Sequence, residues 1–183
     1  MNYGLYYKEV SFNSQSMQVV NTALSGNNFI WETGKLFDQE SGVKRKSDIA
    51  WVRDESLYIM LLKMVKQVNI SAGWNFNITG VEPIQYASYA PGGRYNWHVD
   101  QHPKPVKGNV RKISMSLFLN DDFVGGELDL EIYSPEATPR YKTFKSKLGN
   151  AVFFQGNQWH RVKPVTSGLR KSLVAWFYGP PYS

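Results

Sequence analysis

The chain has 183 residues, of which 42% are hydrophobic and 15% aromatic, so it can bury one substantial core and we expect a single domain. It contains no cysteine, which excludes a disulfide framework and a thiolate metal site and is typical of a reducing compartment. The start has no charged segment followed by an apolar run, and no apolar stretch of about eighteen residues occurs, so we expect a cytoplasmic protein without a membrane span.

The first element in chain order is a helix predicted over Ser14 to Leu24. Its apolar residues Met17, Val20 and Ala23 recur at helical spacing, and the turn-forming residues 26–28 end it. We expect this helix to pack on the outer face of a sheet.

Residues 29–52 predict strands and loops, and they contain the densest run of positive charge, Lys44-Arg45-Lys46. The net charge of +6 is modest and is otherwise spread along the chain. A run of this kind is more often a solvated loop than a nucleic-acid patch. We therefore expect a solvated loop here and no nucleic-acid partner.

The strongest helix signal covers Leu57 to Lys66 and follows Asp54-Glu55-Ser56. Its apolar residues fall on one face at helical spacing, and such a stripe should cover a sheet. The residues of the stripe are Leu57, Met60, Leu61, Met64 and Val65.

After Gly80 the pattern changes to strands. Apolar and polar residues alternate in the segments 112–119 and 127–132, and further strands are predicted over 151–155 and 170–178. Short strands separated by Gly, Pro and Asn turns are typical of a jelly roll. The predicted fold is therefore mostly β with flanking α-helices: a double-stranded β-helix (cupin-like jelly roll) whose N-terminal helices pack on one sheet.

We interpret residues 1–183 as one domain, in which residues 81–183 form the jelly roll and residues 1–80 support its sheet with helices and strands. The polar segments 103–109 and 134–140 are expected to be exposed loops, the first beside the site described next.

Two histidines and one carboxylate predict a metal site. His98 and Asp100 are two positions apart in an extended segment, so their side chains point to the same face and can bind one ion. His160 would complete a two-histidine, one-carboxylate triad, which leaves coordination positions open on non-haem Fe(II). Taken alone, His98 and Asp100 are equally compatible with a half-buried strand histidine that hydrogen-bonds the carboxylate.

The last strand predicts a cavity next to this site. Alternation puts Arg170 and the even-numbered residues up to Trp176 on one face, and the apolar residues 173, 175 and 177 on the other. With the apolar face under the helices, Arg170 would lie in a cavity and bind a carboxylate through two parallel hydrogen bonds. The alternative is an ordinary surface ion pair between Arg170 and a carboxylate such as Asp122.

Five separated segments carry a resemblance to a known family. Residues 89–100 (YAPGGRYNWHVD), 111–120 (RKISMSLFLN), 125–128 (GGEL), 160–165 (HRVKPV) and 168–170 (GLR) resemble the active-site segments of prolyl 4-hydroxylase-like dioxygenases, which depend on Fe(II) and 2-oxoglutarate. Their order and spacing are most similar to the PKHD-type hydroxylases, and the resemblance covers about residues 82–179.

The resemblance implies an oxidoreductase that uses Fe(II), 2-oxoglutarate and O2, with ascorbate (vitamin C) as an optional reductant. The metal ligands would be His98, Asp100 and His160. Arg170 would pair with the distal carboxylate of 2-oxoglutarate, and Tyr89 would hydrogen-bond the cosubstrate. Two further candidates for binding it are Ser172, by strand geometry, and Tyr95, for which a pocket-wall role is an equal alternative.

A prolyl residue of a peptide or protein is the substrate that the resemblance implies, hydroxylated with release of succinate and CO2. Trp97 and Trp159 flank proposed ligands and are candidates for the walls of a peptide groove, with core packing as the equal alternative. Arg94 and Arg161 are candidates for facing an extended peptide or an acidic substrate, and Arg161 stands where the PKHD-type pattern usually has Glu. His102 is expected to face solvent or lie beside the ligands rather than bind the metal.

Three other functions remain open: the same chemistry on a free amino acid or other small molecule, the same chemistry on an alkylated nucleic acid, or a non-catalytic jelly-roll binding protein. Nucleic-acid dealkylases of this type usually have a second Arg six positions beyond the Arg170 position, where this chain has Trp176. A non-catalytic descendant would be expected to lose a ligand, and none is lost here. The oligomeric state is not predicted.

Overall fold

Two packed β-sheets and two helices make up the computed structural model, which describes residues 5–25, 28–33, 36–38, 42–133 and 138–182. The helices are α1 (Ser14–Ser25) and α2 (Glu55–Ser71). The larger sheet has eight strands in the order β1-β13-β9-β16-β7-β5-β2, with β6 paired to β16. The smaller sheet has six, in the order β12-β11-β14-β8-β4-β3, and β10 and β15 form a separate pair.

The bounds of the larger sheet's strands are β1 Tyr7–Ser11, β2 Glu32–Thr33, β5 Asp48–Val52, β6 Gly80–Val81, β7 Ile84–Tyr89, β9 Val110–Phe118, β13 Asn150–Gln155 and β16 Arg170–Gly179. Those of the smaller sheet are β3 Leu36–Asp38, β4 Gly42–Lys46, β8 Arg94–His98, β11 Leu128–Glu131, β12 Tyr141–Phe144 and β14 His160–Val162. The remaining pair is β10 Val124–Gly125 and β15 Val165–Ser167.

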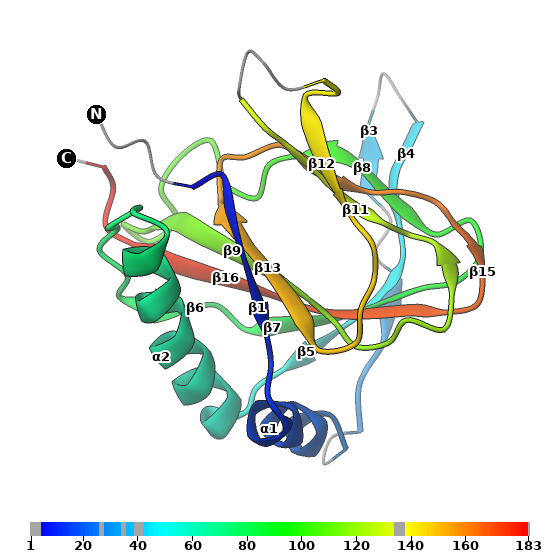
Figure 1. The fold of residues 1–183 in the computed structure, drawn as a ribbon, viewed down its shortest axis with the longest axis horizontal. Helices are drawn as coiled ribbons and strands as arrows, with labels where there is room; N and C mark the ends of the chain where they lie inside the picture. Colours follow the sequence, from blue (N-terminus) through cyan, green and yellow to red (C-terminus); the bar gives the residue numbers. More distant parts are fainter. Residues whose placement is uncertain (1–4, 26–27, 34–35, 39–41, 134–137, 183) are drawn as a thin grey trace.

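Both predicted helices are confirmed, and both lie against the outer face of the larger sheet (Figure 1). Asp54 caps α2, because its side chain accepts a hydrogen bond from the backbone N–H of Leu57 at 2.8 Å and so satisfies a donor that the helix itself cannot pair. Leu57, Leu61 and Val65 of the predicted stripe are fully buried, and Met60 and Met64 pack around them.

The core under α2 confirms the predicted faces of the last strand. Leu173, Ala175 and Phe177 belong to the same cluster of buried residues as Leu57 and Leu61. A second cluster lies between the two sheets and includes Leu128, Leu130, Val152 and Phe154. The alternation of β16 therefore separates the helix-facing core from the space between the sheets.

The first eighty residues complete both sheets. β1 pairs with β13, and β5 pairs with β7 in the larger sheet, while β4 pairs with β8 in the smaller one. β4 thus flanks β8, the strand that ends at the proposed ligand His98.

The expectation for the Lys44–Lys46 run is wrong. The run lies at the end of β4, and Arg45 is buried with only 6% of its surface exposed. Three adjacent charged residues predict exposed side chains when the sequence is considered alone. In the folded chain, pairing of β4 with β8 turns the side chain of Arg45 inward.

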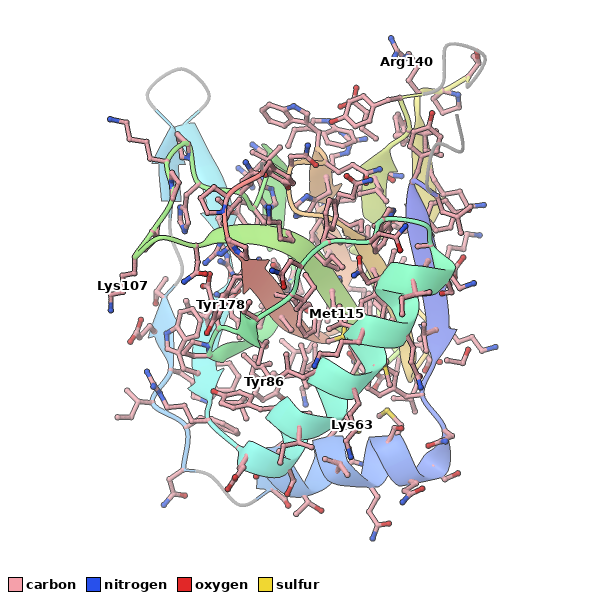
Figure 2. All side chains as sticks on the ribbon, turned by 90° about the vertical axis from the view of Figure 1, so that its left-hand side faces the viewer. Lys63, Tyr86, Lys107, Met115, Arg140 and Tyr178 are labelled. Atoms are coloured by element: carbon pink, nitrogen blue, oxygen red, sulfur yellow. The ribbon has the colours of Figure 1, made fainter. Side chains whose placement is uncertain are left out.

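The expected loop at 103–109 is confirmed as largely exposed, and Figure 2 shows Lys107 projecting from it. Of the second expected loop, residues 134–137 lie outside the described residues, whereas Arg140 is exposed. Within the described part of the chain, neither helix is long and apolar enough to cross a membrane.

Candidate active site

Three side chains that can bind a metal converge between the sheets. His98 is the last residue of β8, His160 is the first of β14, and the two are direct partners in the strand pairing. Asp100 follows β8 and reaches both: its Oδ1 lies 3.7 Å from Nε2 of His98, and its Oδ2 lies 3.4 Å from Nε2 of His160. One ligand atom from each residue lies within 4.8 Å of the others, and all three residues are buried. This is the geometry of a facial triad.

Backbone carbonyls orient both imidazoles. Nδ1 of His98 lies 2.7 Å from the carbonyl oxygen of Asn96, and Nδ1 of His160 lies 3.0 Å from that of Gln158. A carbonyl can only accept, so Nδ1 carries the hydrogen in each ring and Nε2 keeps its lone pair. The two Nε2 atoms and the carboxylate of Asp100 face one another, so that all three could coordinate one metal ion.

The protonation states also suit a metal. Burial, reinforced by the neighbouring His160, lowers the pKa of His98 to about 3, so the ring is neutral near pH 7. Burial would raise the pKa of Asp100, but His160, His98 and the hydroxyl of Ser114 outweigh it and lower that pKa. Ser114 donates to Oδ2 of Asp100 at 2.7 Å, which fixes the carboxylate. Neutral imidazoles and an ionised carboxylate are the forms that bind divalent cations.

A bulge in β8 brings Tyr95 to the same side as His98. The pairing runs from His160↔His98 to Val162↔Tyr95, so two residues of β8, Asn96 and Trp97, lie opposite one residue of β14, Arg161. The ring of Tyr95 therefore stacks on that of His98, with centroids 3.5 Å apart and planes 12° from parallel. Burial raises the pKa of Tyr95 to about 12, which keeps its hydroxyl neutral.

The triad opens into a cavity lined by the inner faces of both sheets. Arg170, Ser172, Val174 and Trp176 of β16 all line it, as the alternation predicts. Tyr89 lines it from β7, where it is the direct partner of Arg170 in the strand pairing. The metal triad and Arg170 therefore share one enclosed space.

Arg170 is 1% exposed and lies between the rings of Tyr89 and Phe118, 5.1 and 5.3 Å from their centroids. Its Nε donates to the carbonyl of Gly126 at 2.8 Å, and its Nη1 donates to Oγ of Ser172 at 2.9 Å. The buried Nη2 has no hydrogen-bond partner among the described residues, and burial lowers the pKa of this guanidinium. A carboxylate in the cavity would satisfy that donor and offset the charge.

Gly126 makes room for this arrangement. Its φ of +65° is one that L side chains rarely adopt, and a Cβ here would lie 2.9 Å from Cδ of Arg170. Asp122, the surface alternative for Arg170, is exposed and instead accepts from the side chain of Asn120 at 2.6 Å. The surface ion pair is therefore not present.

The candidate substrate residues Trp97, Trp159 and Arg161 lie elsewhere. They neighbour inward-facing residues in sequence, and alternation turns them to the outer face of the smaller sheet. Trp97 and Trp159 line a separate hollow there, together with Tyr141 and residues 131 and 140. Nε of Arg161 pairs with Asp129 at 2.8 Å, and its guanidinium lies 4.8 Å from the ring centroid of Trp97. These three side chains do not wall the metal cavity.

The other candidates are placed as follows. Arg94 is half-buried at the start of β8, with its Nη1 3.5 Å from the carbonyl of Gly92, and it does not line the cavity. His102 is exposed, as expected for a histidine that is not a ligand.

Sequence reasoning missed Arg45 and Gln85 as cavity residues. The guanidinium of Arg45 donates from Nη2 to Oε1 of Gln85 at 2.6 Å and lies 4.9 Å from the ring centroid of Tyr95. Residues 44–48 are all polar, so no alternation in the sequence marks Arg45 as an inward-facing residue.

The fold and the site together define a class: jelly-roll proteins with a histidine-carboxylate facial triad and a buried arginine in one cavity. Residues 84–178 match the family model described as the 2OG-Fe(II) oxygenase superfamily. This match covers about half of the chain, and the chain belongs to that superfamily, whose cofactors are Fe(II), 2-oxoglutarate and O2.

Relatives and solved structures agree with the superfamily. The chain is 29% identical over 156 residues to a PKHD-type hydroxylase of Psychrobacter, covering 80% of this chain and 58% of the relative. The viral collagen prolyl hydroxylase of Paramecium bursaria Chlorella virus-1 superposes with a TM-score of 0.68 at 20% identity, covering 96% of this chain and 97% of that one. A prolyl hydroxylase of Trichoplax adhaerens, solved with a hypoxia inducible factor peptide, superposes with a TM-score of 0.64 at 22% identity, covering 94% and 83%. The chain spans about half the length of the curated relatives it matches.

Proposed function

We propose that this protein is an Fe(II)- and 2-oxoglutarate-dependent hydroxylase. The observation that carries the proposal is the pairing, within one cavity, of a facial triad with a buried guanidinium that has an unsatisfied N–H. A 2-oxoglutarate molecule has two ends with matching chemistry, because its keto acid chelates a metal and its distal carboxylate pairs with an arginine. We further propose that residues 1–183 act as one dioxygenase domain, since strands from the first eighty residues complete both sheets.

His98, Asp100 and His160 would hold the metal through Nε2, a carboxylate oxygen and Nε2. When bound, Fe(II) would let O2 react with 2-oxoglutarate and the substrate: one oxygen atom would enter the succinate that forms as CO2 is released, and the other would hydroxylate a C–H bond. Arg170 would orient the cosubstrate through Nη2, and Ser172, which already accepts from Arg170, keeps its own O–H free to donate. The low exposure of these groups excludes bulk water from the reacting centre.

Tyr89 and Tyr95 would complete the cosubstrate end of the cavity. Tyr89 is 2% exposed beside Arg170, and Tyr95 stacks on His98. Both hydroxyls can donate to an oxygen of the cosubstrate while the aromatic faces exclude water.

A prolyl residue in a peptide or protein is the substrate we propose first. Support comes from the PKHD-type relatives and from solved neighbours described as prolyl hydroxylases, one with a peptide. The position of Trp97 and Trp159 on the outer face removes them from the walls of the cavity, so the peptide would approach along other residues.

The test is succinate release by the purified protein with Fe(II), 2-oxoglutarate and ascorbate, with proline-rich peptides and free amino acids as substrates and mass spectrometry of the products. We expect release that depends on Fe(II) and 2-oxoglutarate and a product heavier by one oxygen atom. Absence of both 2-oxoglutarate binding and succinate release in the metal-loaded protein would falsify the proposed function. Hydroxylation of another substrate in place of a prolyl peptide would overturn only the choice of substrate.

A further inference from the structure

Arg45 is a second buried guanidinium in the active-site cavity, and the proposed cosubstrate does not account for it. It is 6% exposed and lines the same cavity as the triad. Nε donates to Oγ of Ser47 at 2.8 Å, and Nη2 donates to Oε1 of Gln85 at 2.6 Å. These partners and the ring of Tyr95 are neutral near pH 7, and no ion pair of Arg45 exists among the described residues.

Two other arginines that lie partly buried, Arg111 and Arg161, have carboxylate partners. Arg111 makes hydrogen bonds to both oxygens of Glu82, at 2.8 and 2.6 Å, and Arg161 pairs with the fully buried Asp129. Arg45 and Arg170 are more deeply buried than these two, and both lack a carboxylate among the described residues. Burying an unpaired cation is costly, so unpaired arginines that line a cavity indicate an anion that binds there.

With Fe(II) and 2-oxoglutarate bound, the cavity would carry a net charge of about +1. Fe(II), Arg170 and Arg45 are the positive groups, and Asp100 is the negative side chain. The two carboxylates of 2-oxoglutarate and that of Asp100 offset Fe(II) and one guanidinium. Arg170 has the unsatisfied Nη2 with which a carboxylate of the cosubstrate would pair, so the guanidinium left without an anion is Arg45.

The position of Arg45 is next to the reacting centre. Its guanidinium lies 4.9 Å from the ring centroid of Tyr95, and that ring stacks directly on His98. An anion bound to Arg45 in this cavity would thus lie close to the triad, and a substrate held by it could present a C–H bond to the metal.

We propose that Arg45 binds a carboxylate of the substrate and so determines which compounds are hydroxylated. This inference rests on the proposed function. The carboxylate has two sources: the α-carboxylate of a free amino acid or similar small acid, or an acidic side chain beside the hydroxylated residue of a peptide. Gln85 positions the guanidinium, because its side-chain oxygen holds Nη2.

The experiment compares acids with their amides on the protein loaded with Mn(II) and 2-oxoglutarate, with binding measured by calorimetry. The probes are the common free amino acids, each paired with its carboxamide, and a capped prolyl peptide with Asp or Asn beside the proline. We expect at least one acid to bind about tenfold or more tightly than its amide, as loss of a partner of a buried charge pair requires. A free amino acid that passes identifies the small-molecule source, and the Asp peptide identifies the peptide source.

Variants of Arg45 complete the test. Arg45→Gln should abolish the preference for the acid over its amide while changing the 2-oxoglutarate affinity by less than about threefold, and Arg45→Lys should keep part of the preference. Lys46→Gln, at the next and exposed position of β4, is the matched control and should change neither.

Two results would overturn the inference. One is equal binding of every acid and its amide by the wild-type protein, a comparison that needs no variant to fold. The other is a loss of more than about tenfold in 2-oxoglutarate affinity in Arg45→Gln, which would make Arg45 part of the cosubstrate site. Failure of the wild-type protein to bind 2-oxoglutarate at all would instead refute the proposed function.

Discussion

Replacing Arg170 by Met should separate cosubstrate binding from folding. In the complex, Met leaves the distal carboxylate of 2-oxoglutarate without a partner in a buried cavity. Breaking a buried charge pair on one side costs about 3–5 kcal/mol, and each 1.4 kcal/mol is a factor of about ten. We therefore expect the dissociation constant for 2-oxoglutarate to rise roughly a hundredfold to a few thousandfold.

The free protein should tolerate the same change. Arg170→Met gives up two hydrogen bonds, to Gly126 and Ser172, each with a net contribution of about 1 kcal/mol. It also removes the unsatisfied Nη2, whose burial costs about 1–3 kcal/mol. These contributions nearly cancel, so the free energy of unfolding should stay within about 2 kcal/mol of the wild-type value.

Calorimetry with Mn(II) in place of Fe(II) measures the affinity without turnover, and urea denaturation measures the stability. Lys171→Met, at the next position on the opposite face of β16, is the control and should leave the affinity unchanged. Arg170→Lys should be intermediate, because it keeps the charge and loses the planar fork. A change in affinity of less than about threefold in a folded Arg170→Met protein would refute the reasoning.

Three further predictions concern the metal, the fold and pH. His160→Ala should lose the bound metal, and Ser114→Ala should weaken metal binding by about 10–100-fold because Asp100 loses the donor that orients it. Elemental analysis after dialysis measures both effects. Full metal occupancy in His160→Ala would contradict the triad. Leu61→Asp should unfold the protein because it buries an unpaired charge between α2 and the sheet. Lys63→Asp, on the exposed side of α2 (Figure 2), is the control and should stay folded. A Leu61→Asp protein that circular dichroism shows to be folded would disprove the core assignment. The pKa of His98 is lowered to about 3 in the folded state and is about 6.5 in the unfolded chain, so the unfolded chain takes up the proton first as the pH falls. The metal-free protein should therefore lose up to several kcal/mol of stability between about pH 6.5 and about pH 3. A stability that stays constant over this range would count against a buried neutral His98.

Local periodicity predicted the elements on which the site is built. The two-residue spacing from His98 to Asp100 puts both side chains on one side, and the alternation along β16 puts Arg170 and Trp176 into the cavity. Both predictions rest on the fixed geometry of an extended chain, which needs no knowledge of distant residues. The helix over residues 57–66 was predictable for the same reason, because its apolar stripe follows the helical repeat.

The inward position of Tyr95 was not predictable from local alternation. Trp97 and Trp159 are adjacent to proposed ligands and therefore point to the opposite face of the sheet, as alternation requires. Alternation from His98 would put Asn96 on the inner face, and a bulge in β8 brings Tyr95 into the cavity instead. A bulge shifts every side chain beyond it by one position, and it depends on pairing with β14, some sixty residues away.

What the sequence by itself determined is the identity and local orientation of the groups proposed to bind metal and cosubstrate, because strand and helix periods are set by the backbone alone. Only the tertiary structure decided that Arg45 belongs to the same cavity. Three adjacent charges look solvent-exposed in isolation, and Arg45 is turned inward only because β4 pairs with β8 and Gln85 of β7 holds its guanidinium. Burial of a charge is a property of the partners around it, and those partners are brought together by strands far apart in the chain.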